Sequence, residues 1–128
     1  MQEKNNPLSP HLQIYRWQIS SLLSITHRIV GVINILAISA ICFWSLFLLL
    51  GAESYEVLNN FFNSFLGKFI AVGLCWTFSF HILNELRHLF WDMGYGFDLK
   101  ISRITGVLAL IGSFVLTILF YLIGKNIF

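Results

Sequence analysis

Between Arg28 and Glu53 the sequence reads IVGVINILAISAICFWSLFLLLGA (residues 29–52), a run of 24 residues without an acidic or basic side chain. A membrane-spanning helix needs about 20 apolar residues to cross about 30 Å of hydrocarbon. This run is long enough to do so as one helix. It therefore predicts that the chain is an integral membrane protein.

A second run of this kind lies near the C-terminus. Residues 104–124 are 21 uncharged residues between Arg103 and Lys125. The composition agrees, because 57% of the chain is hydrophobic and only 11% is charged, whereas a soluble domain carries about 25% charged residues. A soluble globular fold and a disordered chain are disfavoured. The net charge of +2 also disfavours a nucleic-acid binder.

The middle candidate span is shorter. Residues 69–84 form an uncharged run of 16 residues that contains His81. To cross a bilayer, this helix must continue through Glu85, Arg87 and His88. Ionisable groups at such a depth are costly unless they have partners, and they often mark functional sites.

These runs predict an all-α protein with three transmembrane helices in a bundle. We expect a single domain over residues 1–128, made of the following parts: an N-terminal interfacial segment 1–22, spans near 23–50, 67–91 and 103–124, and polar connections at 51–60 and 91–100.

The distribution of basic residues predicts the orientation. Lys68 and Lys125 fall on one side of the three spans, and six basic residues fall on the other: Lys4, Arg16, Arg28, Arg87, Lys100 and Arg103. Since cytoplasmic loops carry the excess of Lys and Arg, the N-terminus is expected on the cytoplasmic or matrix side. His27, His81 and His88 then lie at the same end of the bundle.

His81 and His88 share one face of the middle helix, because seven residues make nearly two turns, and Asn84 and Glu85 are expected between them on that face. Their separation of about 10.5 Å is too long for one metal ion. It suits a haem whose iron binds one imidazole while its propionates approach the other. His81 is the deeper residue and the better ligand candidate. A hydrogen bond from His81 to another helix is the alternative.

Ser24, His27 and Arg28 are related by i, i+3 and i+4 and are expected to form one polar patch at the start of the first span. A hydroxyl, an imidazole and a guanidinium at the hydrocarbon boundary suit a quinone, whose carbonyl oxygens need donors. Ordinary helix capping and snorkelling are the alternative.

Small residues recur on the last span at i, i+4, i+7 and i+11, which predicts close helix packing: Ser102, Gly106, Ala109 and Ser113. Trp91 has the position of an interfacial anchor.

Three motifs together carry a resemblance: PLSPHLQIY at 7–15, SITHR at 24–28 and HILNELRHLFWD at 81–92. In this order and spacing they resemble the cytochrome b subunits of succinate dehydrogenase, the larger membrane anchors of respiratory complex II. The resemblance covers nearly the whole chain.

The resemblance implies roles for individual residues. His81 matches the family's axial ligand to haem b, and His27, Arg28 and His88 match residues near the haem propionates. Ser24 and Arg28 match quinone-site residues. The chain would have no catalytic site of its own.

One departure stands out, because Glu85 occupies a position where the family usually has a small residue, often glycine. A glutamate one turn from His81 would crowd a haem, so we expect it to be solvated or paired with a group outside its own helix. Asn6 and Val30 also depart from the family's usual Arg and Ser or Thr.

The resemblance also implies the setting. The partners would be a flavoprotein subunit, an iron–sulfur subunit and a second, smaller membrane anchor that completes the haem site. The substrate would be ubiquinone, and the location an energy-transducing membrane, either the mitochondrial inner membrane or the bacterial cytoplasmic membrane. A haemless anchor of the same complex, a fumarate reductase anchor and an unrelated three-span scaffold are the alternatives.

Overall fold

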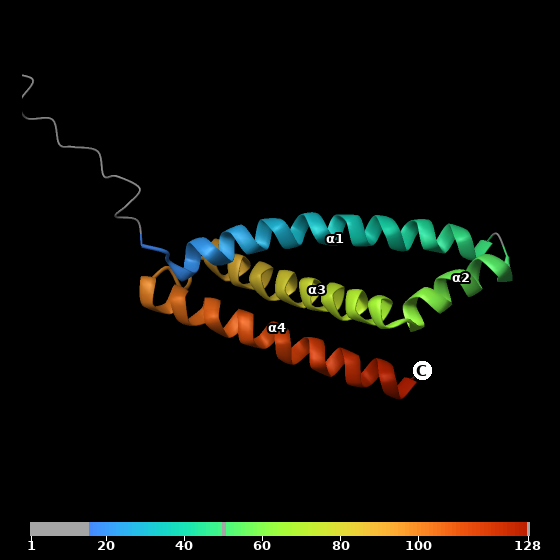
Figure 1. Cartoon of the computed structure of the whole chain (residues 1–128). Helices are drawn as coiled ribbons and strands as arrows, with labels where there is room; N and C mark the ends of the chain where they lie inside the picture. The colour runs from blue at the N-terminus through green and yellow to red at the C-terminus, as the bar shows by residue number, and fades with distance from the viewer. Residues whose placement is uncertain (1–15, 50, 128) are drawn as a thin grey trace, which may run out of the picture.

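The computed structural model describes residues 16–49 and 51–127. Four helices account for most of them (Figure 1): α1 (Ile19–Leu49), α2 (Ala52–Asn63), α3 (Phe65–Asp92) and α4 (Leu99–Ile127). The helices α1, α3 and α4 are long and apolar enough to cross a membrane. The prediction of an all-α membrane protein with three spans is therefore confirmed. The motif at 7–15 and most of the expected interfacial segment lie outside the described residues.

The expected spans fall on α1, α3 and α4, but the helices extend beyond them. α1 begins at Ile19, inside the expected interfacial segment, and α4 begins at Leu99. Hydropathy locates the part of a helix that suits hydrocarbon, whereas backbone hydrogen bonding continues through polar residues such as Ser20 and Ser21.

The first connection differs from the expectation of a polar loop at 51–60, because it contains the helix α2. Gly51, with φ 120°, is the N-cap residue of α2, and Glu53 places a negative charge in the first turn of α2, where the helix dipole favours it. At the other end Ser64 caps α3 by accepting a hydrogen bond from the backbone N–H of Gly67 (3.1 Å). A side chain at Gly67 would collide with the Phe61 backbone, so this glycine permits the tight α2–α3 corner.

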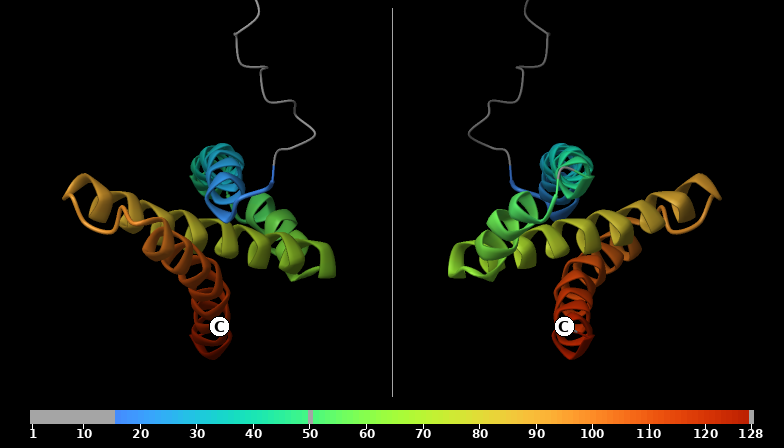
Figure 2. Two further views of the ribbon diagram at one scale, coloured as in Figure 1. Left: turned by 90° about the vertical axis from the view of Figure 1, so that its left-hand side faces the viewer. Right: turned by 90° about the vertical axis from the view of Figure 1, so that its right-hand side faces the viewer.

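The three long helices are arranged around α3 as the central element. Viewed nearly along α1, that helix and α4 lie on different sides of α3 (Figure 2). A small core joins the helices: Leu23, Val30 and Phe80 are buried, with Trp76 and Leu110 packed against them.

The predicted stripe of small residues on α4 does permit close packing. Gly106, Ala109 and Ser113 are buried. A Cβ atom at Gly106 would overlap the Leu23 side chain of α1. The stripe therefore brings the starts of α1 and α4 together at the end of the bundle that also holds the histidines.

Most apolar side chains point outward. Ile35 and Leu36 on α1, for example, are 66% and 65% exposed. Such a surface would aggregate in water, so lipid or other membrane subunits must cover it. The polar Asn34 points inward instead and donates from Nδ2 to the Thr77 carbonyl (3.4 Å), which fixes α1 against α3.

Candidate functional site

Three imidazoles meet at one end of the bundle. His27 of α1 stacks on His81 of α3, with ring centroids 4.4 Å apart and planes 12° from parallel. His88, two turns further along α3, meets His27 edge-on at 5.3 Å. The expectation that these side chains from two helices lie at a similar depth is therefore confirmed.

Glu85 faces the same cluster. Its Oε1 lies 3.1 Å from His27 Nε2 and 3.9 Å from His81 Nε2. The expected partner outside its own helix is thus His27. The Glu85 side chain remains 55% exposed, so the carboxylate lies at the edge of the cluster and has room to turn outward.

Two buried nitrogens of the cluster make no hydrogen bond among the described residues: His27 Nε2, although Glu85 Oε1 lies 3.1 Å away, and His81 Nδ1. His81 Nδ1 is fully shielded from solvent and has no partner among the described residues. Such a group costs about 1–3 kcal/mol when it stays unsatisfied. Beside it, Gly31 of α1 leaves a gap that one methyl group would fill, since a Cβ there would lie 3.5 Å from His81 Cε1.

These features fit a haem. Haem iron in b-type cytochromes is held by imidazole, and His81 offers an imidazole whose side chain is still 32% exposed. His27 stacks on it, His88 adjoins His27, and Gly31 faces it. His27, His81 and Glu85 form a different donor set that suits a single metal ion, because their ligand atoms lie within 4.8 Å of one another.

Ser24, His27 and Arg28, expected to form one patch at the start of α1, point in two different directions. His27 turns inward to α3, and its side chain is only 15% exposed. Ser24 and Arg28 are exposed on the surface of α1. They are therefore placed next to the imidazole cluster but outside it, where a ligand or a partner subunit can reach them.

The structure corrects the expected position of one residue on α3. Asn84 does not share the face of His81 and His88, but lies beside Arg87. Both are buried on the side of α4, where Arg87 Nη1 donates to Asn84 Oδ1 (3.4 Å). The heptad spacing placed the histidines correctly, but Asn84 is three residues from His81 and falls on the flank that α4 covers.

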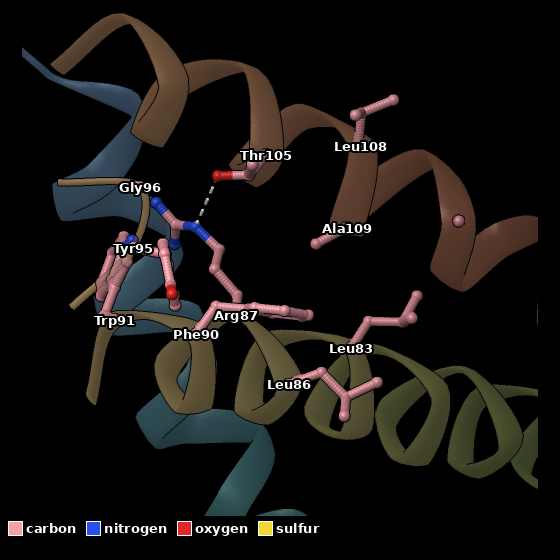
Figure 3. A pocket seen from close by; sticks show the side chains of 11 residues that line it. Leu83, Leu86, Arg87, Phe90, Trp91, Tyr95, Gly96, Thr105, Leu108 and Ala109 are labelled. Carbon is pink, nitrogen blue, oxygen red and sulfur yellow. Dashed lines mark hydrogen bonds between the residues drawn. The ribbon is translucent and has the colours of Figure 1, made fainter. Parts of the chain in front are cut away.

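Arg87 links α3 to α4 through several hydrogen bonds, and Figure 3 shows the one to Thr105. Its Nε donates to Thr105 Oγ1 (3.2 Å), and its Nη2 donates to the carbonyl and the hydroxyl of Ser102 (2.8 and 2.9 Å). The guanidinium also lies 4.1 Å from the ring centroid of Trp91. Trp91 was interpreted only as an interfacial anchor. One sequence signal could have revealed this network: Ser102 and Thr105 are two hydroxyl residues at i and i+3 on a largely apolar helix.

Comparison with known proteins assigns the family. Residues 2–120 match the family described as succinate dehydrogenase/fumarate reductase transmembrane subunit. The chain is 42% identical over 115 residues to the succinate dehydrogenase cytochrome b556 subunit of Rickettsia felis, covering 90% of each chain. It is 35% identical to the cytochrome b556 subunit of Paracoccus denitrificans, covering 90% of this chain and 88% of that one.

A further relative carries the same kind of name. The chain is 35% identical to the succinate dehydrogenase cytochrome b560 subunit of Reclinomonas americana, covering 93% of this chain and 86% of that one. These matches indicate the same family as the three apolar helices of spanning length and the three motifs. The chain belongs to the family of succinate dehydrogenase/fumarate reductase transmembrane subunits.

Proposed function

We propose that this chain is the larger membrane anchor of a succinate dehydrogenase, that it helps to bind haem b, and that it forms part of the ubiquinone-reduction site. The cluster of His27, His81 and His88 is the observation that carries the proposal, because it joins two spanning helices around an unsatisfied imidazole. The relatives named cytochrome b556 and b560 support the haem part.

In this proposal His81 is the axial ligand that the chain supplies to the haem iron. His27, Arg28 and His88 surround the propionates, whose negative charges need cations or donors at the membrane boundary. The bound haem supplies a one-electron redox centre. The chain itself contributes an imidazole held in place by α1, and Gly31 leaves the room beside it.

Ser24 and Arg28 are proposed to donate hydrogen bonds to the quinone. Both are exposed on α1, so a quinone can approach them from the membrane boundary. The apolar outer surface of α1 would accept its isoprenoid tail. The iron–sulfur subunit would deliver electrons at the same end, on the cytoplasmic or matrix side where the charge distribution places the N-terminus.

The proposed assembly contains a flavoprotein subunit, an iron–sulfur subunit and a second, smaller anchor. The second anchor would provide the other axial ligand and cover part of the exposed apolar surface. The complex would reside in the mitochondrial inner membrane or the bacterial cytoplasmic membrane.

Purification of the detergent-solubilised complex through a tag on this chain tests the proposal. A flavoprotein and an iron–sulfur protein are expected to co-purify, and the reduced-minus-oxidised absorption spectrum is expected to show low-spin b-type bands. Failure of the flavoprotein to co-purify would contradict the anchor function, and absence of the b-type bands would contradict the haem assignment alone.

A second candidate is a haemless structural anchor of the same complex. Glu85 favours it, since this carboxylate lies 3.1 Å from His27 Nε2 and 3.9 Å from His81 Nε2, at a position where it would crowd a haem. A fumarate reductase anchor would have the same architecture and differ in the direction of electron flow, which assays with succinate and with fumarate distinguish.

A further inference from the structure

A groove runs along the outer junction of α3 and α4, on the opposite side of α3 from the histidines. Its volume is about 450 Å³, within the range of about 300–1,000 Å³ typical of small-molecule sites. Its lining comes from both helices and from the turn between them (Figure 3): Leu83, Leu86, Arg87, Phe90, Trp91, Tyr95, Gly96, Thr105, Leu108, Ala109 and Gly112.

The two ends of the groove differ in chemistry. Arg87, Trp91, Tyr95 and Thr105 gather at the end next to the α3–α4 turn, whereas leucines and Ala109 line the part deeper in the expected membrane (Figure 3). Ala109 and Gly112 provide the space, since a Cβ at Gly112 would lie only 3.1 Å from a methyl group of Leu83. The lining therefore matches an amphiphile with a polar head and an apolar chain.

The polar end carries an uncompensated positive charge. Arg87 is only 7% exposed, yet no carboxylate lies within ion-pair distance of it in the described part of the chain. Its four hydrogen bonds go to neutral groups, and a guanidinium has five N–H donors. One donor is thus left for an acceptor from outside, and among the described residues the charge meets only the ring of Trp91.

We propose that this groove binds an anionic glycerophospholipid, with its phosphate at Arg87 and one acyl chain along the leucines. A guanidinium is well suited to phosphate recognition. A spanning helix of a partner subunit would need a buried carboxylate at this depth to satisfy the same charge. A phospholipid supplies the anion at the headgroup level, where anionic lipids are found. The proposal requires only that the chain spans a membrane, so it does not depend on the haem or the quinone site.

Photocrosslinking in the reconstituted whole complex tests the proposal. Phosphatidylglycerol and phosphatidylcholine, each with the same photoreactive acyl chain, are compared, and adducts are mapped to peptides of α3 and α4. In the wild type, phosphatidylglycerol should label the groove about fivefold more than phosphatidylcholine, the preference expected from one basic residue near the surface. Arg87→Gln should reduce the ratio to about one, and Arg103→Gln, which removes an exposed charge of α4 outside the groove, should preserve it.

A second variant keeps the test decisive if Arg87→Gln prevents assembly. Leu108→Trp narrows the groove from an exposed position and retains Arg87, so labelling of the groove by both lipids should fall while labelling elsewhere persists. Equal labelling by the two lipids in the wild type would overturn the proposal and indicate ordinary surrounding lipid. Crosslinks from the groove to another subunit in place of lipid would overturn it in favour of a protein occupant.

Discussion

The two sides of α3 use polar side chains in opposite ways. On the side of α4, Asn84 and Arg87 are buried and bonded to each other and to neighbouring groups. On the side of α1, His81, Glu85 and His88 stay partly exposed, and the imidazole of His81 keeps a buried nitrogen without a partner.

The comparison separates bonded from unsatisfied polar side chains within the eight residues 81–88. A satisfied buried network rigidifies the helices that it joins, whereas an unsatisfied buried group in a native protein calls for a ligand or another specific cause. We therefore propose that the α4 side mainly joins the helices, with only one donor and the charge of Arg87 left for a lipid, and that the α1 side binds the cofactor. The predictions below test this division.

His81→Ala should have the largest effect, because it removes the proposed ligand from the unsatisfied side. Low-spin haem should disappear from the spectrum of the purified complex, while all three spans stay inserted, since alanine is tolerated in lipid. His88→Ala is the matched control on the same face, and it should retain low-spin bands. Unchanged low-spin haem in the His81 variant would exclude this residue as the ligand.

Arg28→Leu should reduce quinone reduction by roughly ten- to hundredfold, the equivalent of losing a charged hydrogen bond of about 1.5–3 kcal/mol in the rate-limiting step. Succinate oxidation with an artificial soluble acceptor should change far less. The measurement compares the two rates in one preparation, with Arg103→Leu as a control for loss of an exposed charge. If both rates fell equally, assembly rather than the quinone site would be affected.

Arg87→Met should affect stability and not redox chemistry. The variant removes the bonds to Asn84, Ser102 and Thr105 and leaves these groups unsatisfied, so the free energy of unfolding should fall by about 1.5–3 kcal/mol. Thermal melting of the complex measures this, with Arg103→Met as the exposed counterpart. Low-spin haem lost at temperatures where Arg87→Met is still folded would show that the two sides of α3 are not independent.

Glu85→Gly should have the smallest effect. The carboxylate is more than half exposed, and such ion pairs contribute about 0–1 kcal/mol. Haem content and turnover should stay similar to those of the wild type, as should those of Glu85→Gln, which keeps the size and removes the charge. A large gain of haem in the glycine variant would favour the haemless anchor as the native state.

The sequence predicted which imidazoles come together better than it predicted the residues around them. The spacing of His81 and His88, together with the expected topology, was sufficient to bring them to His27. The partner of Glu85 was expected outside α3 but could not be named, and the burial of Arg87 was missed. A helix's own period fixes which residues share a face, but the rotation of that helix against its neighbours depends on how all three helices pack.

The sequence by itself determined the three spans, their order and the end of the bundle that holds the imidazoles. These properties follow from local hydropathy and charge, which act on each segment separately. Only the tertiary structure decided that residues 52–63 form a helix, that Arg87 binds α4, and that Glu85 meets His27. Each of these depends on contacts between helices, where close approach at Gly67 and Gly106 selects one packing arrangement among several that hydropathy alone would allow.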